Sequence, residues 1–346
     1  MTLHFRRWGL AGLVAAALAG GCAEVPPPTF SQKFEPVDAA TEVTDMGRGV
    51  NVLDNDPAWT DPGNARFKPR LFQTIRRAGF SNVRIVLEAF GHMEGKDNRL
   101  PAHWLKTLDE MVGAALDAGL TVVIDEHDYN FCGKHADECG PKLDAFWAQV
   151  APRYRDAPNR VVFEVLNEPF GEMTAERWNR QLVETLSVIR ASNPARNVIV
   201  GPASWNSLDQ LAALQLPADD RHIVVTFHYY LPMTFTHQGA SWVESTRHLS
   251  GVHWGTEAEY DAMRKDFDRV KAWSERENRP IFLGEFGAYE AAPFPDRLRW
   301  TWAAARTAEA HGFAWAYWYF DGGFTVYDID RDRWIEPILN VLIPKT

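Results

Sequence analysis

Positive charge is scarce in this 346-residue sequence. Its 36 lysine and arginine residues are outnumbered by 46 aspartate and glutamate residues, which gives a formal net charge of -10 at pH 7. Binding to nucleic acid requires a basic surface that neutralises phosphates, so the deficit argues against a nucleic-acid partner. Low-complexity bias is also absent, and the apolar fraction of 46% is that of a globular protein. We therefore expect a folded protein that does not bind nucleic acid.

Long hydrophobic runs are few, and the most prominent one lies near the N-terminus. Arg6 and Arg7 precede an apolar segment, 8–18, which is followed by small residues and Cys22. This segment is too short for a stable transmembrane anchor and has the pattern of a signal peptide. We therefore expect residues 1–22 to be a signal peptide and residues 23–44 to be a proline-rich tether, with the product exported to the periplasm or the medium.

Two ways of processing this signal are open. The triplet Ala17-Leu18-Ala19 resembles an A-x-A cleavage site, which would release a secreted protein. The stretch LAGGC at 18–22 resembles a lipoprotein box, although Ala19 stands where a larger aliphatic residue is usual. We favour the lipoprotein, because a cysteine directly after the small residues is otherwise unexplained. Cys22 would then carry a lipid that anchors the protein to the outer membrane, its only expected membrane contact.

Cysteine is scarce as well: besides Cys22 the sequence contains only Cys132 and Cys139. In an exported protein two neighbouring cysteines form a disulfide by default. The alternative is a metal site that includes His135, which lies between them, or His127 upstream, but the spacing matches no standard zinc pattern. The sequence therefore predicts a disulfide and no metal.

From residue 49 onward, short apolar runs alternate with longer amphipathic ones. Strands are predicted at 49–52, 82–87, 120–125, 160–167, 197–201, 223–230, 280–284 and 313–318. Helices are predicted at 67–78, 104–118, 143–154, 175–191, 207–214, 257–278, 297–311 and 337–342. Eight such units in roughly 300 residues fit one α/β domain, a (β/α)8 TIM barrel over residues 45–346. A doubly wound open sheet is the alternative, but the glycine-rich phosphate turn after the first strand is missing.

Polar and aromatic side chains occupy the predicted strand ends, as the stretch VVFEVLNEPF at 161–170 shows. Its apolar run ends in Asn167 and Glu168, although burying a charge is costly unless the charge is compensated. The other strands end in a similar way, with Arg84, His127, His228, Tyr230, Glu285 and Trp318. Because the C-terminal ends of barrel strands meet at one mouth, we expect these side chains to form a site there.

Glu168 and Glu285 supply the paired carboxyl groups of glycoside hydrolysis. In that chemistry one carboxyl donates a proton to the leaving oxygen and the other attacks the anomeric carbon. A cation such as Arg84 beside Glu285 would lower the pKa of that carboxyl, and Tyr230 could donate a hydrogen bond to it. Asn167 is placed to bind the 2-hydroxyl group of the sugar. The pattern predicts hydrolysis without a metal or cofactor.

These motifs together resemble glycoside hydrolase family five. They are VVFEVLNEPF, IFLGEFG around Glu285, HYY at 228–230, VRI around Arg84 and AYW at 316–318, in the family's order and on the matching strands. The resemblance begins at about residue 47 and reaches the C-terminus. It implies a retaining mechanism with Glu168 as acid/base and Glu285 as nucleophile. It also implies a cleavage subsite lined by Asn167, Arg84, His127, His228, Tyr230 and Trp318, and sugar contacts further out by Asn51, His237 and Trp242.

Two stretches bear on the substrate. The sequence TFTHQGASW at 234–242 resembles bacterial endoglucanases of the family, including members that cut both β-glucan and β-mannan. Relatives often place a second histidine after His127, whereas this chain has Asp128, an acceptor that changes the polar set. We expect an endo-acting β-1,4-glucanase, or cellulase, for which mannan is a weaker substrate. Trp205 could equally stack on a sugar or fill the rim.

Several other activities are alternatives to this reading. A β-mannanase, a dual glucanase/mannanase or a transglycosylase of the same family would share these residues. A carbohydrate-binding module without catalysis is disfavoured, because both glutamates are present. The expected partner is a polysaccharide or oligosaccharide, and the protein is expected to be a monomer.

Overall fold

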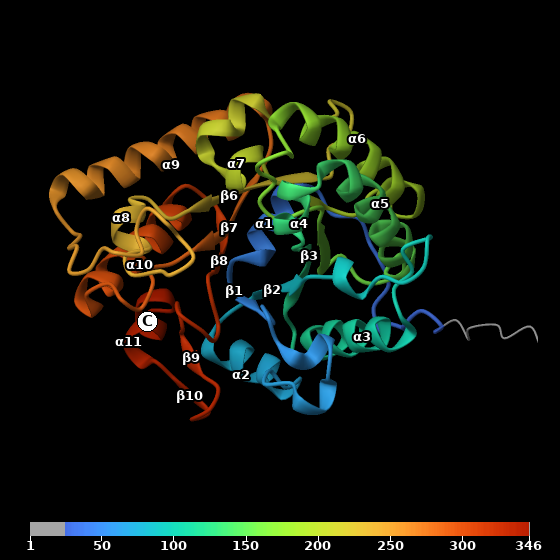
Figure 1. The fold of residues 1–346 in the computed structure, drawn as a ribbon, viewed down its shortest axis with the longest axis horizontal. Helices are drawn as coiled ribbons and strands as arrows, with labels where there is room; N and C mark the ends of the chain where they lie inside the picture. The colour runs from blue at the N-terminus through green and yellow to red at the C-terminus, as the bar shows by residue number, and fades with distance from the viewer. Residues whose placement is uncertain (1–24, 346) are drawn as a thin grey trace, which may run out of the picture.

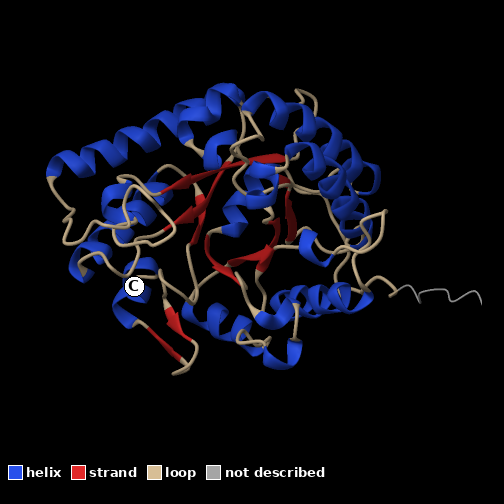
Figure 2. Cartoon of the chain, in the orientation of Figure 1, coloured by secondary structure: helices blue, strands red, loops and turns tan. Residues whose placement is uncertain are grey.

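Eight parallel strands close into a barrel in the computed structural model, which describes residues 25–345. Each strand pairs with the next along the chain, and β8 pairs with β1. The strands form an inner ring that helices surround (Figure 2). They are β1 (Arg48–Val52), β2 (Asn82–Leu87), β3 (Thr121–Glu126), β4 (Val161–Glu164), β5 (Val198–Val200), β6 (Ile223–Tyr229), β7 (Ile281–Phe286) and β8 (Ala314–Tyr317). The predicted (β/α)8 barrel is confirmed.

The outer helices alternate with the strands along the chain and lie around the outside of the barrel (Figure 1). They are α2 (Arg70–Ala78), α3 (Ala102–Asp117), α5 (Ala136–Arg153), α6 (Ala175–Ser192), α9 (Glu257–Glu277), α10 (Phe294–Ala310) and α11 (Glu336–Leu342). Two predictions need correction. The fifth helix is a 3₁₀ helix, η4 (Leu208–Ala213), and α5 begins seven residues earlier than residue 143, because Gly140 and Pro141 disguise its first turns.

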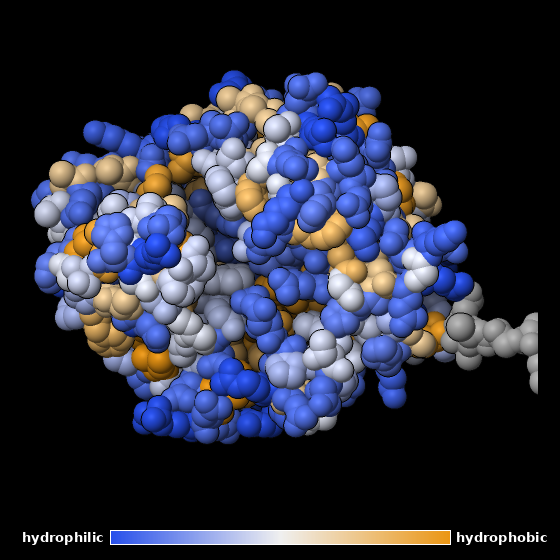
Figure 3. Space-filling view, viewed as in Figure 1, coloured by the Kyte–Doolittle hydropathy of each residue, from blue (hydrophilic) through white to orange (hydrophobic). Residues whose placement is uncertain are grey.

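Short elements lie in the loops at the strand ends. They are α4 (Tyr129–Lys134) after β3, α7 (Ala203–Asn206) after β5, α8 (Met233–Thr236) after β6, and a hairpin of β9 (Tyr327–Asp328) and β10 (Arg333–Trp334) after β8. The surface is hollowed between the region around α8 and the region around α4 (Figure 3). These loops therefore surround the mouth where the sequence places its site.

The barrel interior has two layers of different chemistry. Because alternate residues of a strand face inward, Val123 and Asp125 share the interior, as do Val162 and Glu164. The lower residue of each pair belongs to a buried apolar cluster with residues of the other strands, namely Ile199, Val224, Phe282, Ala314 and Ala316. The upper residue of each pair is a carboxylic acid. The interior is therefore apolar at the N-terminal end of the strands and polar at the end that carries the mouth.

An N-terminal helix, α1 (Ala39–Met46), closes the apolar end of the barrel. Its Ala39, Val43 and Met46 are buried within the lower interior cluster. Asp38 caps the helix by accepting hydrogen bonds from the backbone N–H groups of Ala40 and Thr41. The helix therefore belongs to the barrel and forms its floor.

The residues before α1 also pack on the barrel, which corrects the prediction of a proline-rich tether over residues 23–44 for the part that the structure describes. Arg153 donates hydrogen bonds to the carbonyl oxygens of Val25 and Pro26 at 3.0 and 2.9 Å. The guanidinium of Arg196 lies 4.5 Å from the centre of the Phe34 ring. We call residues 25–46 the N-terminal strap. The domain that the structure describes therefore begins about twenty residues earlier than position 45.

Membrane-related predictions fall on the remaining N-terminal residues. The predicted signal peptide and Cys22 lie outside the described residues. Within residues 25–345, no helix has both the length and the apolar character needed to cross a bilayer.

Candidate active site

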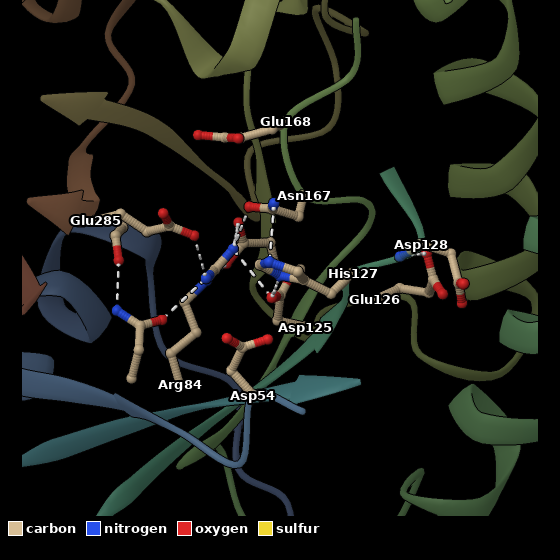
Figure 4. A network of polar contacts seen from close by, with 12 residues as sticks. Asp54, Arg84, Asp125, Glu126, His127, Asp128, Asn167, Glu168 and Glu285 are labelled. Carbon is tan, nitrogen blue, oxygen red and sulfur yellow. Dashed lines mark hydrogen bonds and ion pairs between the residues drawn. The ribbon is translucent and has the colours of Figure 1, made fainter. Parts of the chain in front are cut away.

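Glu168 and Glu285 lie together at the mouth (Figure 4). Glu168 lies just past the end of β4, and Glu285 lies at the C-terminal end of β7. One oxygen of each carboxyl and a ring nitrogen of His228 lie within 4.8 Å of one another. Carboxyl groups that are about 5–5.5 Å apart permit direct attack on an anomeric carbon, whereas wider pairs leave room for a water. The predicted pair is therefore brought together at the close spacing.

Glu285 is held by a donor on each oxygen. Nη1 of Arg84 donates to Oε1 at 2.9 Å, and the hydroxyl of Tyr230 donates to Oε2 at 2.9 Å. Burial raises the pKa of Glu285, and the Arg84 cation opposes that rise. Arg84 lowers the pKa of Glu285 as predicted, but burial outweighs this effect, so the net shift is upward. Two donors nevertheless stabilise the anionic form and fix its orientation.

Glu168 has a different environment. Its Oε1 lies 2.7 Å from Nδ1 of His228, and no cation contacts it directly among residues 25–345. Burial, and then the negative charge of Glu285, raise the pKa of Glu168 well above the ordinary range. The backbone of Glu168 has a φ of 40°, which non-glycine residues rarely adopt. The two carboxyls are therefore distinguished, with Glu168 as the group that keeps a proton and Glu285 as the one that ionises more readily.

Arg84 is the centre of a buried network that the sequence only partly revealed. Its Nε and Nη2 donate to the two oxygens of Glu164 at 2.6 and 2.9 Å, and Nη2 lies 3.0 Å from Oδ2 of Asp125. Burial raises the pKa values of both Glu164 and Asp125 to about 7. Sequence reasoning missed the role of Glu164. The available signal was a lone glutamate inside an apolar strand, on the same face as Val162.

Asn51 has a structural role instead of the predicted contact with a distant sugar. Its side chain is fully buried, and its Oδ1 accepts a hydrogen bond from Nη1 of Arg84 at 2.9 Å. Its Nδ2 donates to the carbonyl oxygens of Gly284, Ala316 and Tyr317. A side chain that ties β1 to β7 and β8 beneath the site cannot reach a ligand in the cleft. Asn51 therefore supports Arg84.

Gly284 explains part of the IFLGEFG motif before Glu285. A Cβ atom at this position would lie 2.6 Å from Oγ1 of Thr226 and 2.9 Å from Nε2 of His228. Both contacts are too short for real atoms, so only glycine allows β6 and β7 to approach this closely. The absence of a side chain therefore makes room for His228 beneath the two glutamates.

Asn167 and His127 form a second chain of contacts beside Arg84. Oδ1 of Asn167 accepts from Nη2 of Arg84 at 2.7 Å, and its Nδ2 lies 3.1 Å from Nε2 of His127. Nδ1 of His127 lies 2.6 Å from Asp125. Burial lowers the pKa of His127 to about 4, so the ring is neutral and the Asp125 contact places its proton on Nδ1. The ring stacks on Trp318 at 5.7 Å with an interplanar angle of 7°.

Aromatic side chains are exposed around the mouth. Trp242 is 59% exposed and Trp205 is 53% exposed, and Trp205 stacks on Phe170 with ring centres 4.8 Å apart. The ring of His237 is buried between Trp242 and Tyr230, at centre distances of 6.5 and 4.9 Å. An exposed indole face fits the apolar face of a sugar ring. The structure thus groups the predicted His237 and Trp242 on one side of Tyr230.

The predicted disulfide between Cys132 and Cys139 is confirmed, with an S–S distance of 1.99 Å. It joins α4 to α5 beside the mouth. Because both sulfur atoms are used in this bond, the alternative metal site with His135 is wrong. The glutamates and His228 are not assigned to a metal either, since the donors around Glu285 include a guanidinium that already supplies positive charge.

Asp128 does not take the place that its sequence position suggested. Its Oδ2 accepts a hydrogen bond from the backbone N–H of Phe90 at 2.7 Å, and its own N–H donates to the buried Glu126 at 3.2 Å. Figure 4 shows Asp128 and Glu126 on the side of His127 away from Glu285. Asp128 therefore anchors the loop after β2, which weakens the argument that it selects between glucan and mannan.

A closed (β/α)8 barrel with paired glutamates at the ends of β4 and β7 defines the class of protein: it is a glycoside hydrolase. The family model described as cellulase, glycosyl hydrolase family 5, matches residues 42–323. The chain belongs to this family.

Relatives of known name support the assignment. Endoglucanase H of Acetivibrio thermocellus is 30% identical over 91% of this chain, which spans only 34% of that relative's length. Endoglucanase A of Paenibacillus barcinonensis is 25% identical, with 94% of this chain and 92% of the relative covered. The structure of Thermotoga maritima Cel5A with mannotriose has a TM-score of 0.85 and 36% identity, covering 88% of this chain and all of the other. The same enzyme with cellobiose has a TM-score of 0.84 and 36% identity over the same shares.

Proposed function

We propose that this protein is an endo-acting, retaining β-1,4-glucanase. The observation that carries the proposal is the close pair of Glu168 and Glu285 in different environments, one beside a neutral imidazole and the other between a guanidinium and a phenol. Relatives that bear the name endoglucanase support the substrate class.

The geometry supports a double displacement. In the first step the Glu285 carboxylate attacks the anomeric carbon, while Glu168 gives its proton to the glycosidic oxygen and the aglycone leaves. In the second step Glu168 takes a proton from water, the water oxygen attacks the anomeric carbon, and the bond to Glu285 breaks. Arg84 and Tyr230 stabilise the carboxylate that departs, and Tyr230 remains protonated because burial raises its pKa. Asn167, oriented by Arg84, offers its amide N–H to the sugar.

Azide rescue tests the two roles separately. On an activated aryl β-cellobioside we expect Glu285→Ala to lose activity by about four orders of magnitude or more, and added azide to yield the α-glycosyl azide. Glu168→Ala still forms the covalent intermediate, so azide yields the β-glycosyl azide instead. Glu172→Ala, on the same loop but exposed, serves as the control. Near wild-type rates in both glutamate variants would contradict the assignment.

The glucan preference is a separate part of the proposal. Exposed tryptophans bind either sugar by a ring face, whereas polar groups distinguish the equatorial 2-hydroxyl of glucose from the axial one of mannose. Thermotoga maritima Cel5A has been crystallised with both sugar types, so mannan is a real competitor. We expect a higher kcat/KM on cellohexaose than on mannohexaose. A preference for mannohexaose of tenfold or more would make the protein a mannanase, and mass spectrometry of elongated products would reveal transglycosylation.

Export is the final part of the proposal. The disulfide of Cys132 and Cys139 supports an oxidising compartment, because cytosolic thiols are kept reduced. We propose that Cys22 is lipidated and that the protein acts as a monomer at the cell surface or in the periplasm. Metabolic labelling with a fatty acid, lost in Cys22→Ala, tests the anchor. Unlabelled protein in the medium would instead favour cleavage at the A-x-A site.

A further inference from the structure

The ring of His228 has a second nitrogen whose partner is not among the predicted site residues. Nδ1 faces Glu168, while Nε2 lies 3.3 Å from Nδ2 of Asn206. Asn206 is fully buried, and its Oδ1 has no hydrogen-bond partner among the described residues. A buried acceptor without a partner is costly. The contact with His228 is therefore the one side-chain hydrogen bond of Asn206 among the described residues.

The backbone that presents Asn206 is strained. Ser204, Trp205 and Asn206 have φ values of 59°, 61° and 52°, three successive residues in the left-handed region, which is unfavourable for residues such as Ser204 and Trp205. One contact holds this turn in place, and one glycine leaves room for it. The N–H of Trp205 donates to the carbonyl oxygen of Pro169, the residue after Glu168, and a Cβ at Gly201 would overlap the Asn206 amide. The turn is thus tied to the same loop that carries Glu168.

The contact at Nε2 decides where the proton of the ring resides. Burial lowers the pKa of His228 well below its ordinary value, so the ring is neutral and has one N–H. Because an amide NH₂ group is a donor, the nitrogen that it faces must be the acceptor. The proton then lies on Nδ1, which donates it to Glu168 at 2.7 Å. The arrangement favours the carboxylate form of Glu168 and opposes the effect of burial.

We propose that Asn206 is a positioning residue that sets the tautomer of His228 and thereby adjusts the proton affinity of Glu168. This inference rests on the proposed function, in which Glu168 is an acid in the first step and a base in the second. In the second step Glu285 is esterified and uncharged, but burial still favours the protonated form of Glu168, so its action as a base needs an opposing influence. The Nδ1–H of His228, held by Asn206, supplies it.

The tautomer itself gives the most direct test and does not depend on activity. In protein labelled with ¹⁵N-histidine, ring nitrogen shifts distinguish Nδ1–H from Nε2–H. The signal of His228 among the 11 histidines is identified by its loss in His228→Gln. We expect Nδ1–H at neutral pH. A ring that carries its proton on Nε2, or on both nitrogens, would overturn the proposal while leaving the proposed function intact.

Kinetics of Asn206→Asp test the consequence. A carboxylate only accepts, so it draws the proton to Nε2, leaves Nδ1 as an acceptor and holds the proton on Glu168. With a dinitrophenyl cellobioside, whose leaving group needs no acid, we expect kcat to fall by about tenfold or more while kcat/KM changes little. The basic limb of kcat/KM on cellohexaose is expected to move upward in pH. Equal losses in both parameters without that movement would indicate a merely structural role.

Two further variants separate charge and packing from the tautomer. Asn206→Leu has no charge and no donor, and we expect it to admit the Nε2–H tautomer. Thr226→Val is the matched control, because the Thr226 hydroxyl is buried near His228 and has no partner among the described residues. We expect Thr226→Val to keep the wild-type tautomer and pH profile. A wild-type tautomer in Asn206→Leu would contradict the proposal.

The other titratable groups around Glu168 are the same in the wild type and in all of these variants. They are Glu285, Arg84, Asp125, Glu164, Tyr129 and Tyr230.

Discussion

The lower and upper layers of the barrel interior differ sharply although the same strands build both. Val123 and Val162 lie in the lower layer, and Asp125 and Glu164 follow them two residues later, about 7 Å further along their strands. The lower layer packs on α1 and consists of apolar side chains. In the upper layer several carboxylic acids share a single guanidinium, that of Arg84. The lower layer therefore serves stability and the upper layer serves chemistry. Variants in each layer can test this separation of roles.

Two buried arginines allow the strongest test. Arg84→Met leaves Glu164, Asp125 and Glu285 without their cation, and breaking a buried ion pair costs about 3–5 kcal/mol. We expect that loss in free energy of unfolding by urea denaturation, together with a decrease in kcat of about a thousandfold or more. Arg196 is also fully buried but donates to backbone carbonyl oxygens near the strap. Arg196→Met is expected to lower stability and to leave kcat of the folded protein unchanged. A comparable loss of kcat in both variants would remove the distinction.

A cavity in the lower layer is expected to affect stability alone. Val162→Ala removes two methyl groups from a fully buried site beneath Glu164, so we expect a loss of about 2 kcal/mol. Val183→Ala on α6, where the side chain is 53% exposed, is the control and should change little. Activity of Val162→Ala on β-glucan should equal that of the wild type at 25 °C. A tenfold decrease in kcat would show that the layers are coupled.

The disulfide lies outside both layers, and we expect its removal to lower stability by no more than the cavity in the lower layer does. Cross-linking a loop of this length contributes about 2 kcal/mol in chain-entropy terms. We expect Cys132→Ser with Cys139→Ser to lower the melting temperature by a few degrees and to raise protease sensitivity around α4. Thiol titration of the unfolded, unreduced wild type should detect neither cysteine. Two reactive thiols would show that the bond does not form in the protein.

Substitution of Glu42 in α1 is expected to have the smallest effect on the free energy of unfolding, and this effect depends on pH. Burial raises its pKa to about 7, and its Oε2 accepts a hydrogen bond from Asn197. A raised pKa stabilises the fold fully below the unfolded-state value, and this contribution is lost as the pH rises toward 7. We therefore expect Glu42→Gln to match the wild type near pH 4 and to exceed it by on the order of 1 kcal/mol at pH 8. Glu35→Gln, exposed in the strap, is the control; an effect independent of pH would contradict the prediction.

Sequence patterns identified the barrel and most of the site because both depend on local signals. Strand and helix periodicity is local, and the C-terminal end of each strand necessarily meets the others at the mouth. Glu168, Glu285, Arg84, Asn167, His228 and Tyr230 were thus found from position alone, and the structure brings them into contact.

The rest of the site depends on which way each side chain points and on contacts between distant segments. Asn51 and Asp128 stand at strand ends like true site residues, but their partners are carbonyl and backbone N–H groups that periodicity does not reveal. Asn206 belongs to a left-handed turn that the sequence does not indicate, because Ser204 and Trp205 do not favour a positive φ. The strap resembled a linker because its proline-rich composition conceals its contact with Arg153 and the burial of its α1 residues in the lower interior cluster.

The floor helix also constrains the order in which the chain can fold. Residues of α1 pack against β6 and β8, which are made roughly 180 and 270 positions later. Contacts of such high sequence separation form slowly, because loop closure must precede them. The floor cannot seal until the last strand has been synthesised and paired with β1. Until then α1 lacks one of the two strands against which it packs.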